Sequence, residues 1–207
     1  MVFSDGTEFS RRGTWRETLR LPGQLIFEIG CNDAGLLASV AAKHPSTSFV
    51  GIDWKCRALH TAAERVAALD LRNVALLHGR AQDVHRFFAD GELDEIWIFH
   101  PEPLDTPREL KNRLLGEPFL IDAHHALRGG GSLILKTDHR GYFDAVIGLL
   151  GRMTDRFAIG TMSLEFWNDP TAQSAVAGRA FAGELTAFES RFVRKRKPIH
   201  FLEIRRR

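Results

Sequence analysis

The feature that most constrains this chain is an apolar segment that runs into a glycine-containing turn, residues 26–35, followed by a second apolar segment, residues 49–53. The second segment ends in an acid, Asp53, which comes 23 residues after Gly30. This order of strand, turn, helix and strand is the layout of a βαβ unit that binds a nucleotide-type ligand. The turn lets a ligand approach the backbone, and the acid can accept hydrogen bonds from ribose hydroxyls. The pattern therefore predicts an α/β fold with a ligand site, and a unit that binds no ligand is the alternative.

The residues of the turn favour S-adenosylmethionine over a dinucleotide. A dinucleotide site uses the pattern G-x-G-x-x-G to bring the backbone close to a pyrophosphate, whereas residues 28–32 read Glu-Ile-Gly-Cys-Asn. S-adenosylmethionine has no phosphate and carries a sulfonium and an amino acid group, which suit carboxylates near the turn. We therefore expect Glu28, Gly30 and Asp53 to bind this cofactor.

Length and composition exclude several classes of protein. The chain has 207 residues, which suits one domain with a large core. No stretch is long and apolar enough to span a bilayer and no secretory signal opens the chain, so we expect no membrane partner. The two cysteines, Cys31 and Cys56, give no disulfide framework and fit the cytoplasm. The nine histidines show no metal-ligand spacing, so we predict no metal site.

The positive charge is concentrated at the two ends of the chain. The formal net charge is +2, but residues 179–207 hold nine Arg or Lys residues against three Glu residues. Residues 11–20 add four arginines. Basic ends on a near-neutral body suit a polyanion such as RNA. The alternative is a solvated, partly disordered tail, which is the favoured interpretation for residues 205–207.

Apolar strands alternate with helical patterns, which predicts one α/β domain with a mainly parallel, seven-stranded sheet and helices on both faces. We expect a basic N-terminal extension over residues 1–22 and the domain over residues 23–207. The expected strands are 25–30, 48–53, 73–77, 93–99, 132–137, 156–162 and 184–191, with 198–204 as a further candidate. The expected helices are 35–43, 57–70, 84–88, 108–115, 118–127 and 142–150, the glycines at 129–131 acting as a helix terminator. Residues 169–183 are expected to form a loop or a short helix.

Ligands of open α/β sheets bind at the carboxyl ends of the strands, so the polar residues there are the candidates for a site. One of them, Glu102, lies between Pro101 and Pro103, which stiffen the backbone on both sides of it. A carboxylate in a fixed position suits an enzyme that must hold an acceptor nitrogen near a cofactor. A rigid turn with an exposed glutamate is the alternative.

Two further stretches suit a nucleic acid. Arg108, Lys111 and Arg113 follow the proline-containing loop, where they are placed to contact phosphates, although a solvated helix face fits equally well. Thr186 and Glu189 lie in an expected late strand. A Thr/Glu pair can bind the hydrogen-bonding edge of guanine, because a carboxylate accepts from its N1 and N2 hydrogens. A plain surface strand is the alternative.

These motifs together resemble the bacterial tRNA (guanine-N7-)-methyltransferase family over residues 25–205. The matching motifs are Glu28-Ile29-Gly30, Gly51-Ile52-Asp53, His100-Pro101-Glu102-Pro103, the basic positions Arg108, Lys111 and Arg113, Thr137-Asp138 with Tyr142, and Thr186-x-Phe188-Glu189-x-Arg191. The resemblance implies a single-domain, Rossmann-like class I methyltransferase that transfers a methyl group from S-adenosylmethionine to N7 of a guanine in tRNA. A monomer or a homodimer is expected.

The resemblance also implies a role for individual residues. It implies cofactor binding by Glu28, Gly30, Asp53, Ala81, Gln82, His100 and Glu102, with Glu102 also at the catalytic position. It implies that the target nucleoside is bound by Asp138, Thr186 and Glu189, and that tRNA is bound by Arg108, Lys111 and Arg113.

The chain departs from the family pattern at the cofactor turn. Asn32 and Ala34 stand where the family has glycines, and each adds a Cβ there, although asparagine tolerates left-handed backbone. Arg80 replaces an acid before Ala81, and His100 replaces an aromatic residue. Two alternative functions follow: a methyltransferase of a small molecule or a protein, or a non-catalytic RNA-binding module on a degenerate methyltransferase fold.

Overall fold

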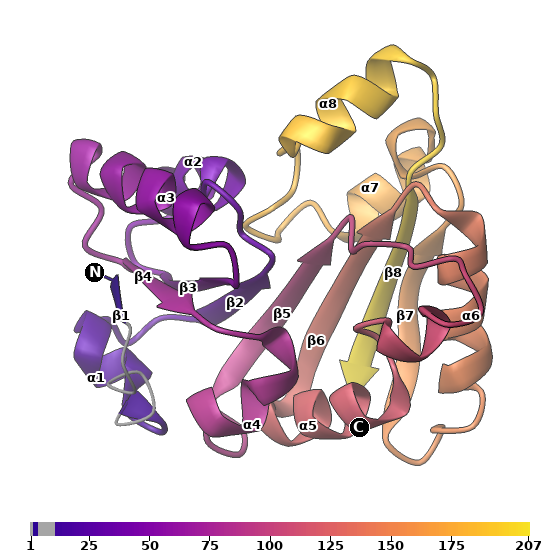
Figure 1. Ribbon diagram of the computed structural model, residues 1–207, viewed down its shortest axis with the longest axis horizontal. Coiled ribbons are helices and arrows are strands. Elements are labelled where there is room, and N and C mark those ends of the chain that lie inside the picture. The colour runs from indigo at the N-terminus through magenta and orange to yellow at the C-terminus, as the bar shows by residue number, and fades with distance from the viewer. Residues whose placement is uncertain (1, 4–10) are drawn as a thin grey trace.

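One twisted sheet with helices on both faces forms the core of the protein (Figure 1). The computed structural model describes residues 2–3 and 11–207, and within this part of the chain the sheet has eight strands in the order β1-β4-β3-β2-β5-β6-β8-β7. The strands are β1 (Val2–Phe3), β2 (Leu25–Ile29), β3 (Ser48–Asp53), β4 (Val74–His78), β5 (Leu93–Phe99), β6 (Leu127–Thr137), β7 (Phe157–Ser163) and β8 (His200–Arg206).

The predicted fold is confirmed. Strands β2 to β6 run parallel to one another, whereas β8 is antiparallel to both β6 and β7. Together with β7 and β8 they make the mainly parallel sheet that was expected, and the two-residue strand β1 adds a further strand beside β4. Because β2, β3, β5 and β6 are parallel, their carboxyl ends lie at one edge of the sheet.

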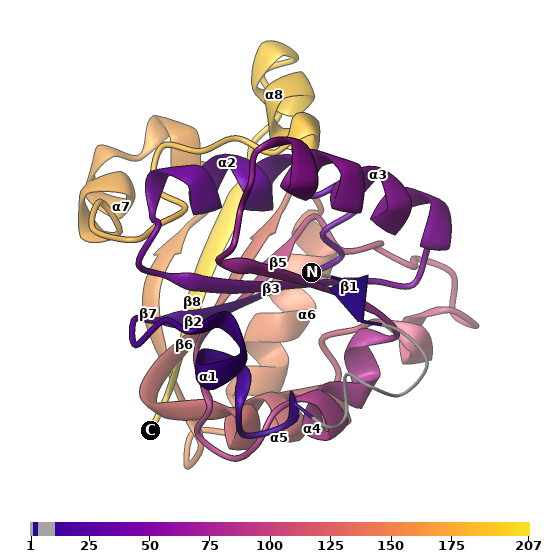
Figure 2. The same cartoon turned by 90° about the vertical axis from the view of Figure 1, so that its left-hand side faces the viewer.

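Helices cover the two faces of the sheet, with α2, α3 and α7 on one face and α4, α5 and α6 on the other (Figure 2). A separate apolar core fills each of the two layers. The helices are α1 (Trp15–Leu19), α2 (Gly35–Lys43), α3 (Cys56–Ala68), α4 (Val84–Phe87), α5 (Glu117–Ala126), α6 (Arg140–Leu150), α7 (Pro170–Ala175) and α8 (Ala187–Arg194). Single 3₁₀ turns form η2 (Ala81–Asp83), η3 (Leu110–Asn112) and η4 (Phe166–Asn168).

The sequence explains these elements through burial. All five residues of β2 are buried, as expected for a central parallel strand covered on both faces. In α3 the buried residues are Leu59, Ala62 and Val66, whose spacing of three and four places them on one face of the helix.

The described part of the predicted N-terminal extension packs onto the domain. Trp15 in α1 is fully buried, and its indole nitrogen donates to the carbonyl oxygen of Phe87 over 2.8 Å. Arg16 lies 2.6 Å from Asp94 at the start of β5. Residues 1 and 4–10 of the extension lie outside the described residues.

The expected strand at 184–191 is wrong, because this segment forms the helix α8. Thr186 Oγ1 accepts a hydrogen bond from the backbone nitrogen of Glu189 (3.0 Å), and Glu189 Oε2 accepts one from the backbone nitrogen of Thr186 (2.9 Å). This reciprocal capping box satisfies two of the orphan donors at a helix start and fixes where the helix begins. Thr186 and Phe188 therefore do not share a face as they would in a strand.

Two further predictions are corrected around α5. The helix ends at Ala126, and the glycines at 129–131 lie inside β6 instead of terminating the helix. The strand begins early because Leu127 already pairs with Leu93 of β5, after which the register shifts. The helix expected at 108–115 is reduced to the single turn η3.

The terminal arginines are ordered, so the expectation of a disordered tail is wrong. Arg205 and Arg206 are the last residues of β8. The guanidinium of Arg205 lies 2.9 Å from Glu203, and Arg206 Nη1 donates to the carbonyl oxygen of Leu127. The backbone nitrogen of Arg207 donates to the carbonyl oxygen of Arg156 over 2.9 Å. Within the described chain, the helices are too short or too polar to cross a bilayer.

Candidate functional site

The turn after β2 keeps an unusual backbone conformation despite its two departures from glycine. Gly30, Asn32 and Ala34 all have positive φ angles, of 75°, 49° and 52°. The backbone nitrogens of Gly30 and Cys31 both donate to the carbonyl oxygen of Ile52, at 2.9 and 3.1 Å. These bonds tie the turn to β3, so the left-handed positions are imposed by the surrounding structure.

Glu28 lies beneath this turn and is buried. Its Oε2 atom has no hydrogen-bond partner among the described residues. Burial raises the pKa of Glu28 to about 8, and the nearby carboxylates Asp33 and Asp53 add to the increase. A buried acid with a free oxygen beside two more acids is suited to a cationic group of a ligand, because the cation would favour the ionised form.

Asp53 is oriented by the backbone around it. Its Oδ2 accepts from the backbone nitrogen of Asn32 (3.0 Å), and its Oδ1 accepts from the backbone nitrogen of Lys55 (2.9 Å). Gly51 lets this strand end lie close to the turn, since a Cβ at residue 51 would come within 2.9 Å of Cys31 Sγ. A carboxylate held in this way still has lone pairs for ribose hydroxyls.

The proposed catalytic acid lies at the surface close to this strand end. The side chain of Glu102 is 71% exposed, and its Oε1 is 3.8 Å from the ammonium of Lys55. Trp54, between Asp53 and Lys55, is 63% exposed, and the Lys55 ammonium lies 5.3 Å from its ring centroid. Trp54 is not among the predicted site residues, although a large aromatic residue directly after the acid at the end of the second strand was the available signal.

Ala81 and Gln82 begin η2, which follows β4 at the same edge of the sheet. Ala81 packs against the apolar core and Gln82 is exposed. Arg80, which precedes them, is also exposed. The edge of the sheet thus brings the predicted cofactor residues from β2, β3, β4 and β5 together.

His100 directly follows β5 and lies next to β6. Its backbone has a φ of 54°, and its backbone nitrogen donates to the carbonyl oxygen of Lys136 over 2.7 Å. The ring is buried, 3.7 Å from Asp138 Oδ1 and 5.5 Å from the ring of Phe192, and neither ring nitrogen is hydrogen-bonded within the described chain. Burial lowers the pKa of His100, so its neutral form is favoured.

The three basic residues after the proline loop have different surroundings. Arg108 and Lys111 are exposed. Arg113 binds the loop itself, since its Nε donates to the carbonyl oxygen of Pro103 (2.7 Å) and its Nη2 to Asp105 (3.0 Å). Its guanidinium also lies 5.0 Å from the ring centroid of Tyr142. Arg113 therefore stabilises the loop that carries Glu102.

The helix α8 lies above the carboxyl ends of β5 and β6 (Figure 1). Glu189, predicted to bind the target nucleoside, is fully buried and turned toward Lys136. Thr186 is half-buried at the helix start, and Phe188 is 51% exposed on another side of the helix. The structure thus brings Asp138, His100 and α8 together, with the Glu189 carboxylate facing inward.

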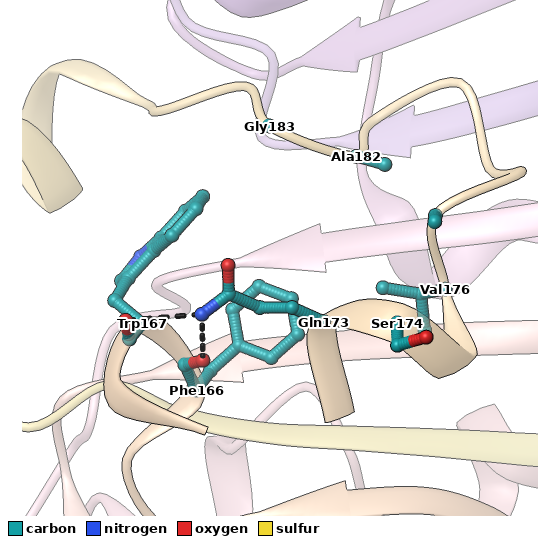
Figure 3. A pocket seen from close by; sticks show the side chains of 8 residues that line it. Phe166, Trp167, Gln173, Ser174, Val176, Ala182 and Gly183 are labelled. Atoms are coloured by element: carbon teal, nitrogen blue, oxygen red, sulfur yellow. Dashed lines mark hydrogen bonds between the residues drawn. The ribbon is translucent and has the colours of Figure 1, made fainter. Parts of the chain in front are cut away.

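An open pocket lies between η4, α7 and residues 182–183 (Figure 3). Gln173 holds its wall in place, because its Nε2 donates to the carbonyl oxygens of Phe166 (3.1 Å) and Trp167 (3.0 Å). Elsewhere, no group of three or more metal-ligating side chains lies together in the part of the chain that the structure describes.

Solved structures define the fold class. The chain aligns with an antibiotic-related methyltransferase at a TM-score of 0.62 and 14% identity, covering 99% of this chain and 95% of the other. It aligns with a 16S rRNA (adenine(1408)-N(1))-methyltransferase from Catenulisporales acidiphilia at a TM-score of 0.60 and 15% identity, covering 98% and 91%. The fold is that of the class I methyltransferases.

Sequence comparison then gives the family. The family model Methyltransf_4, described as "Putative methyltransferase", matches residues 22–202, and the chain belongs to this family. A tRNA (guanine-N(7)-)-methyltransferase of Lactococcus lactis subsp. cremoris is 27% identical over 192 residues, which are 93% of this chain and 84% of the relative. One from Geobacillus thermodenitrificans is 33% identical over 135 residues, 65% and 62% of the two chains.

A third relative is much longer than this chain. It is a bifunctional glycosyltransferase/methyltransferase of Fusobacterium nucleatum, 25% identical over 207 residues, and the chain spans 31% of its length. The family resemblance noted from the sequence is confirmed by these matches.

Proposed function

We propose that this chain transfers a methyl group from S-adenosylmethionine to N7 of a guanine in tRNA. The observation that carries the proposal is the buried Glu28 beneath a left-handed turn, whose Oε2 has no hydrogen-bond partner among the described residues, with Asp53 fixed beside it. Relatives named tRNA (guanine-N(7)-)-methyltransferase that align over most of the chain support the choice of acceptor.

The residues at the sheet edge fit the cofactor group by group. In the proposal, Glu28 faces the cationic amino acid end of S-adenosylmethionine, whose positive charge offsets the cost of a buried carboxylate. Asp53 accepts from the ribose hydroxyls, while Gly30 permits close approach of the backbone. Ala81 and Gln82 lie at the adenine side, and His100 closes the site from the end of β5.

The reaction needs alignment more than it needs a base. N7 of guanine is a lone-pair nucleophile with no proton to remove, so catalysis depends on holding it in line with the methyl group. The purine becomes cationic as the methyl group arrives. Glu102 is proposed to stabilise this charge and to orient the base, and its rigid, proline-flanked position suits that role. The chemistry requires no metal ion.

The acceptor side has exposed groups suited to RNA. Asp138 and Thr186 border the space next to His100 and are the proposed contacts to the target nucleoside, whereas Glu189, the third residue that the resemblance implies, is buried against Lys136. Arg108 and Lys111 are the proposed phosphate contacts. Exposed cations at the end of α8 and just after it extend this basic surface: Arg191, Arg194, Lys195 and Arg196. Binding through such groups weakens steeply as salt rises.

The remaining parts of the proposal concern the whole protein. We propose a cytoplasmic enzyme that acts as a monomer or a homodimer, with the catalytic domain over residues 23–207. Sedimentation measurements with and without tRNA would separate the two oligomeric states.

Methyl transfer from labelled S-adenosylmethionine to tRNA lacking N7-methylguanine tests the proposal. Label recovered in N7-methylguanosine after digestion to nucleosides is the expected result. Cofactor binding without transfer to RNA would point to a small-molecule or protein acceptor. Absence of cofactor binding would favour a non-catalytic RNA-binding module.

A further inference from the structure

A fully buried ion pair joins α8 to the centre of the sheet. The side chains of Lys136 in β6 and Glu189 in α8 are both 0% exposed, and Lys136 Nζ lies 3.0 Å from Glu189 Oε1. Burial lowers the pKa of Lys136, and Glu189 opposes this decrease. The ammonium lies 4.9–5.4 Å from the centroids of four aromatic rings: Phe99, Phe166, Trp167 and Phe181.

Both carboxylate oxygens of Glu189 are already used inside the protein. Oε2 accepts the capping hydrogen bond from the backbone nitrogen of Thr186 (2.9 Å). Oε1 accepts from the indole nitrogen of Trp167 (3.3 Å) in addition to facing Lys136. Trp167 belongs to η4, whose carbonyl oxygens Gln173 binds in turn (Figure 3). Both oxygens of the Glu189 carboxylate therefore already have partners within the protein.

The helix held by this pair carries an aromatic surface next to the site. The ring of Phe192 lies 5.5 Å from that of His100, and the half-exposed ring of Phe188 stacks on Phe192 at 6.4 Å. Lys197, just beyond the helix, lies 4.0 Å from Asp138. The position of α8 therefore decides where Phe188 and Thr186 lie relative to the loop that carries Glu102.

We propose that Lys136 and Glu189 are positioning residues, whose buried ion pair fixes α8 over the His100 loop, and that Glu189 does not itself contact the acceptor base. The inference concerns the acceptor side of the proposed function and rests on it for its catalytic consequence. Removing one partner of a buried pair leaves the other charge uncompensated, which is costly, whereas neutralising both is tolerated far better. The two charges should thus be dispensable together and indispensable singly.

Hydrogen exchange of the free protein tests the structural part without any assay of activity. The variants are Lys136→Met, Glu189→Gln and the double variant. The glutamine amide keeps an oxygen that can accept the capping hydrogen bond from the backbone nitrogen of Thr186. Amides of residues 187–194 should exchange at least about tenfold faster in each single variant and within about threefold of wild type in the double variant. Wild-type exchange in both single variants would overturn the proposal.

Kinetics on tRNA separate positioning from direct contact. If the pair positions α8, each single variant raises KM for tRNA at least about tenfold, the affinity for S-adenosylmethionine is unchanged, and the double variant recovers most of the loss. If Glu189 bound the base directly, Lys136→Met would stay near wild type and the double variant would be as impaired as Glu189→Gln. That second pattern would overturn the proposal. A wild-type protein that methylates no tRNA would refute the proposed function while leaving the exchange experiment valid.

Glu95→Gln is the matched control. Glu95 is also buried and paired with an arginine, Arg179, and it accepts from Trp97 Nε1 over 2.7 Å. It has no contact with α8 among these interactions. This variant should leave the exchange of residues 187–194 and the KM for tRNA at wild-type values. Faster exchange of α8 in the control would show that any lost buried charge loosens the helix, against the specific role proposed for the pair.

Discussion

The turn after β2 and the helix α8 contribute to the same edge of the sheet, but they are held there in different ways. The turn is held by hydrogen bonds within one βαβ unit: the backbone nitrogens of Gly30 and Cys31 donate to β3, and Asp53 accepts from the backbone nitrogen of Asn32. In α8, the fixed point is Glu189, whose partner Lys136 is 53 positions away in the chain. The cofactor side is thus organised by backbone groups within one βαβ unit, whereas the acceptor side depends on side-chain contacts between distant parts of the chain, of which the buried pair is one. Mutations should therefore affect the two sides separately.

The largest effect is expected on kcat, from the loss of the Glu102 carboxylate. Glu102→Ala should lower kcat by at least about 100-fold, because the charge that develops on the purine loses its stabilising carboxylate. The fold should be kept, since the side chain is largely exposed. Glu117→Ala, at an exposed acid in the first turn of α5, is the control and should turn over like wild type. Wild-type kcat for Glu102→Ala would remove this residue from the mechanism.

The next effect should fall on the cofactor side. Asp53→Ala removes the acceptor of two backbone hydrogen bonds as well as the proposed ribose contact, and should weaken S-adenosylmethionine binding by about 100-fold. Calorimetry measures this affinity, and hydrogen exchange of α8 in the same variant should match wild type. Cofactor affinity within about twofold of wild type, or loosening of α8, would contradict the separation of the two sides.

Cofactor affinity should also depend on pH through Glu28. Its pKa is raised from 4.5 to about 8 in the folded protein, so Glu28 holds a proton at neutral pH while the site is free. Because the folded protein binds this proton more tightly than the unfolded chain does, the free energy of unfolding falls as pH rises from 4.5 toward 8. A cationic ligand favours the carboxylate, so binding releases the proton. Affinity should rise with pH by up to about tenfold per unit and level off above about pH 8.

Calorimetry in buffers of different ionisation enthalpy would count the released proton. Glu28→Gln is the matched variant, because it keeps the shape and removes the titrating group. It should bind the cofactor more weakly and with little dependence on pH between 6 and 8. A wild-type affinity that stays flat over this range would mean that Glu28 does not face the cationic group.

The smallest effect concerns the backbone of the turn. Asn32 is exposed and left-handed, and asparagine tolerates this conformation, so Asn32→Gly should change stability by no more than about 0.5 kcal/mol. Asn32→Val places a β-branched residue there and should destabilise by about 1–2 kcal/mol, a fall in Tm of about 2–8 °C. Thermal unfolding checks both. Equal Tm values for the two variants would show that the turn is not held in this conformation.

Local order explains why the turn and the position of its acids could be predicted from the sequence. The apolar runs, Gly30 and Asp53 are signals within one βαβ unit, and the structure places Glu28 and Asp53 together as expected. Trp54 could not be predicted in the same way. Whether a large aromatic residue after a strand is buried or exposed depends on what packs against it in the fold, and the sequence does not show this.

The acceptor side was harder for physical reasons. The polar and apolar alternation at 184–191 suggests a strand, but the Thr186 and Glu189 spacing is also that of a capping box, which prevails in the structure. The direction in which Glu189 points depends on Lys136, a contact that no local pattern encodes. Likewise, the final arginines are ordered because β8 inserts between β6 and β7, which is a property of the whole sheet.

The most direct test of the central claim replaces the acceptor atom itself. Two tRNA transcripts, one with guanosine and one with 7-deazaguanosine in place of it, would be incubated with the enzyme and labelled S-adenosylmethionine. The account predicts transfer to the guanosine transcript and none to the 7-deaza transcript, because a carbon there has no lone pair to accept the methyl group. Equal labelling of the two transcripts would contradict methylation at N7 of guanine.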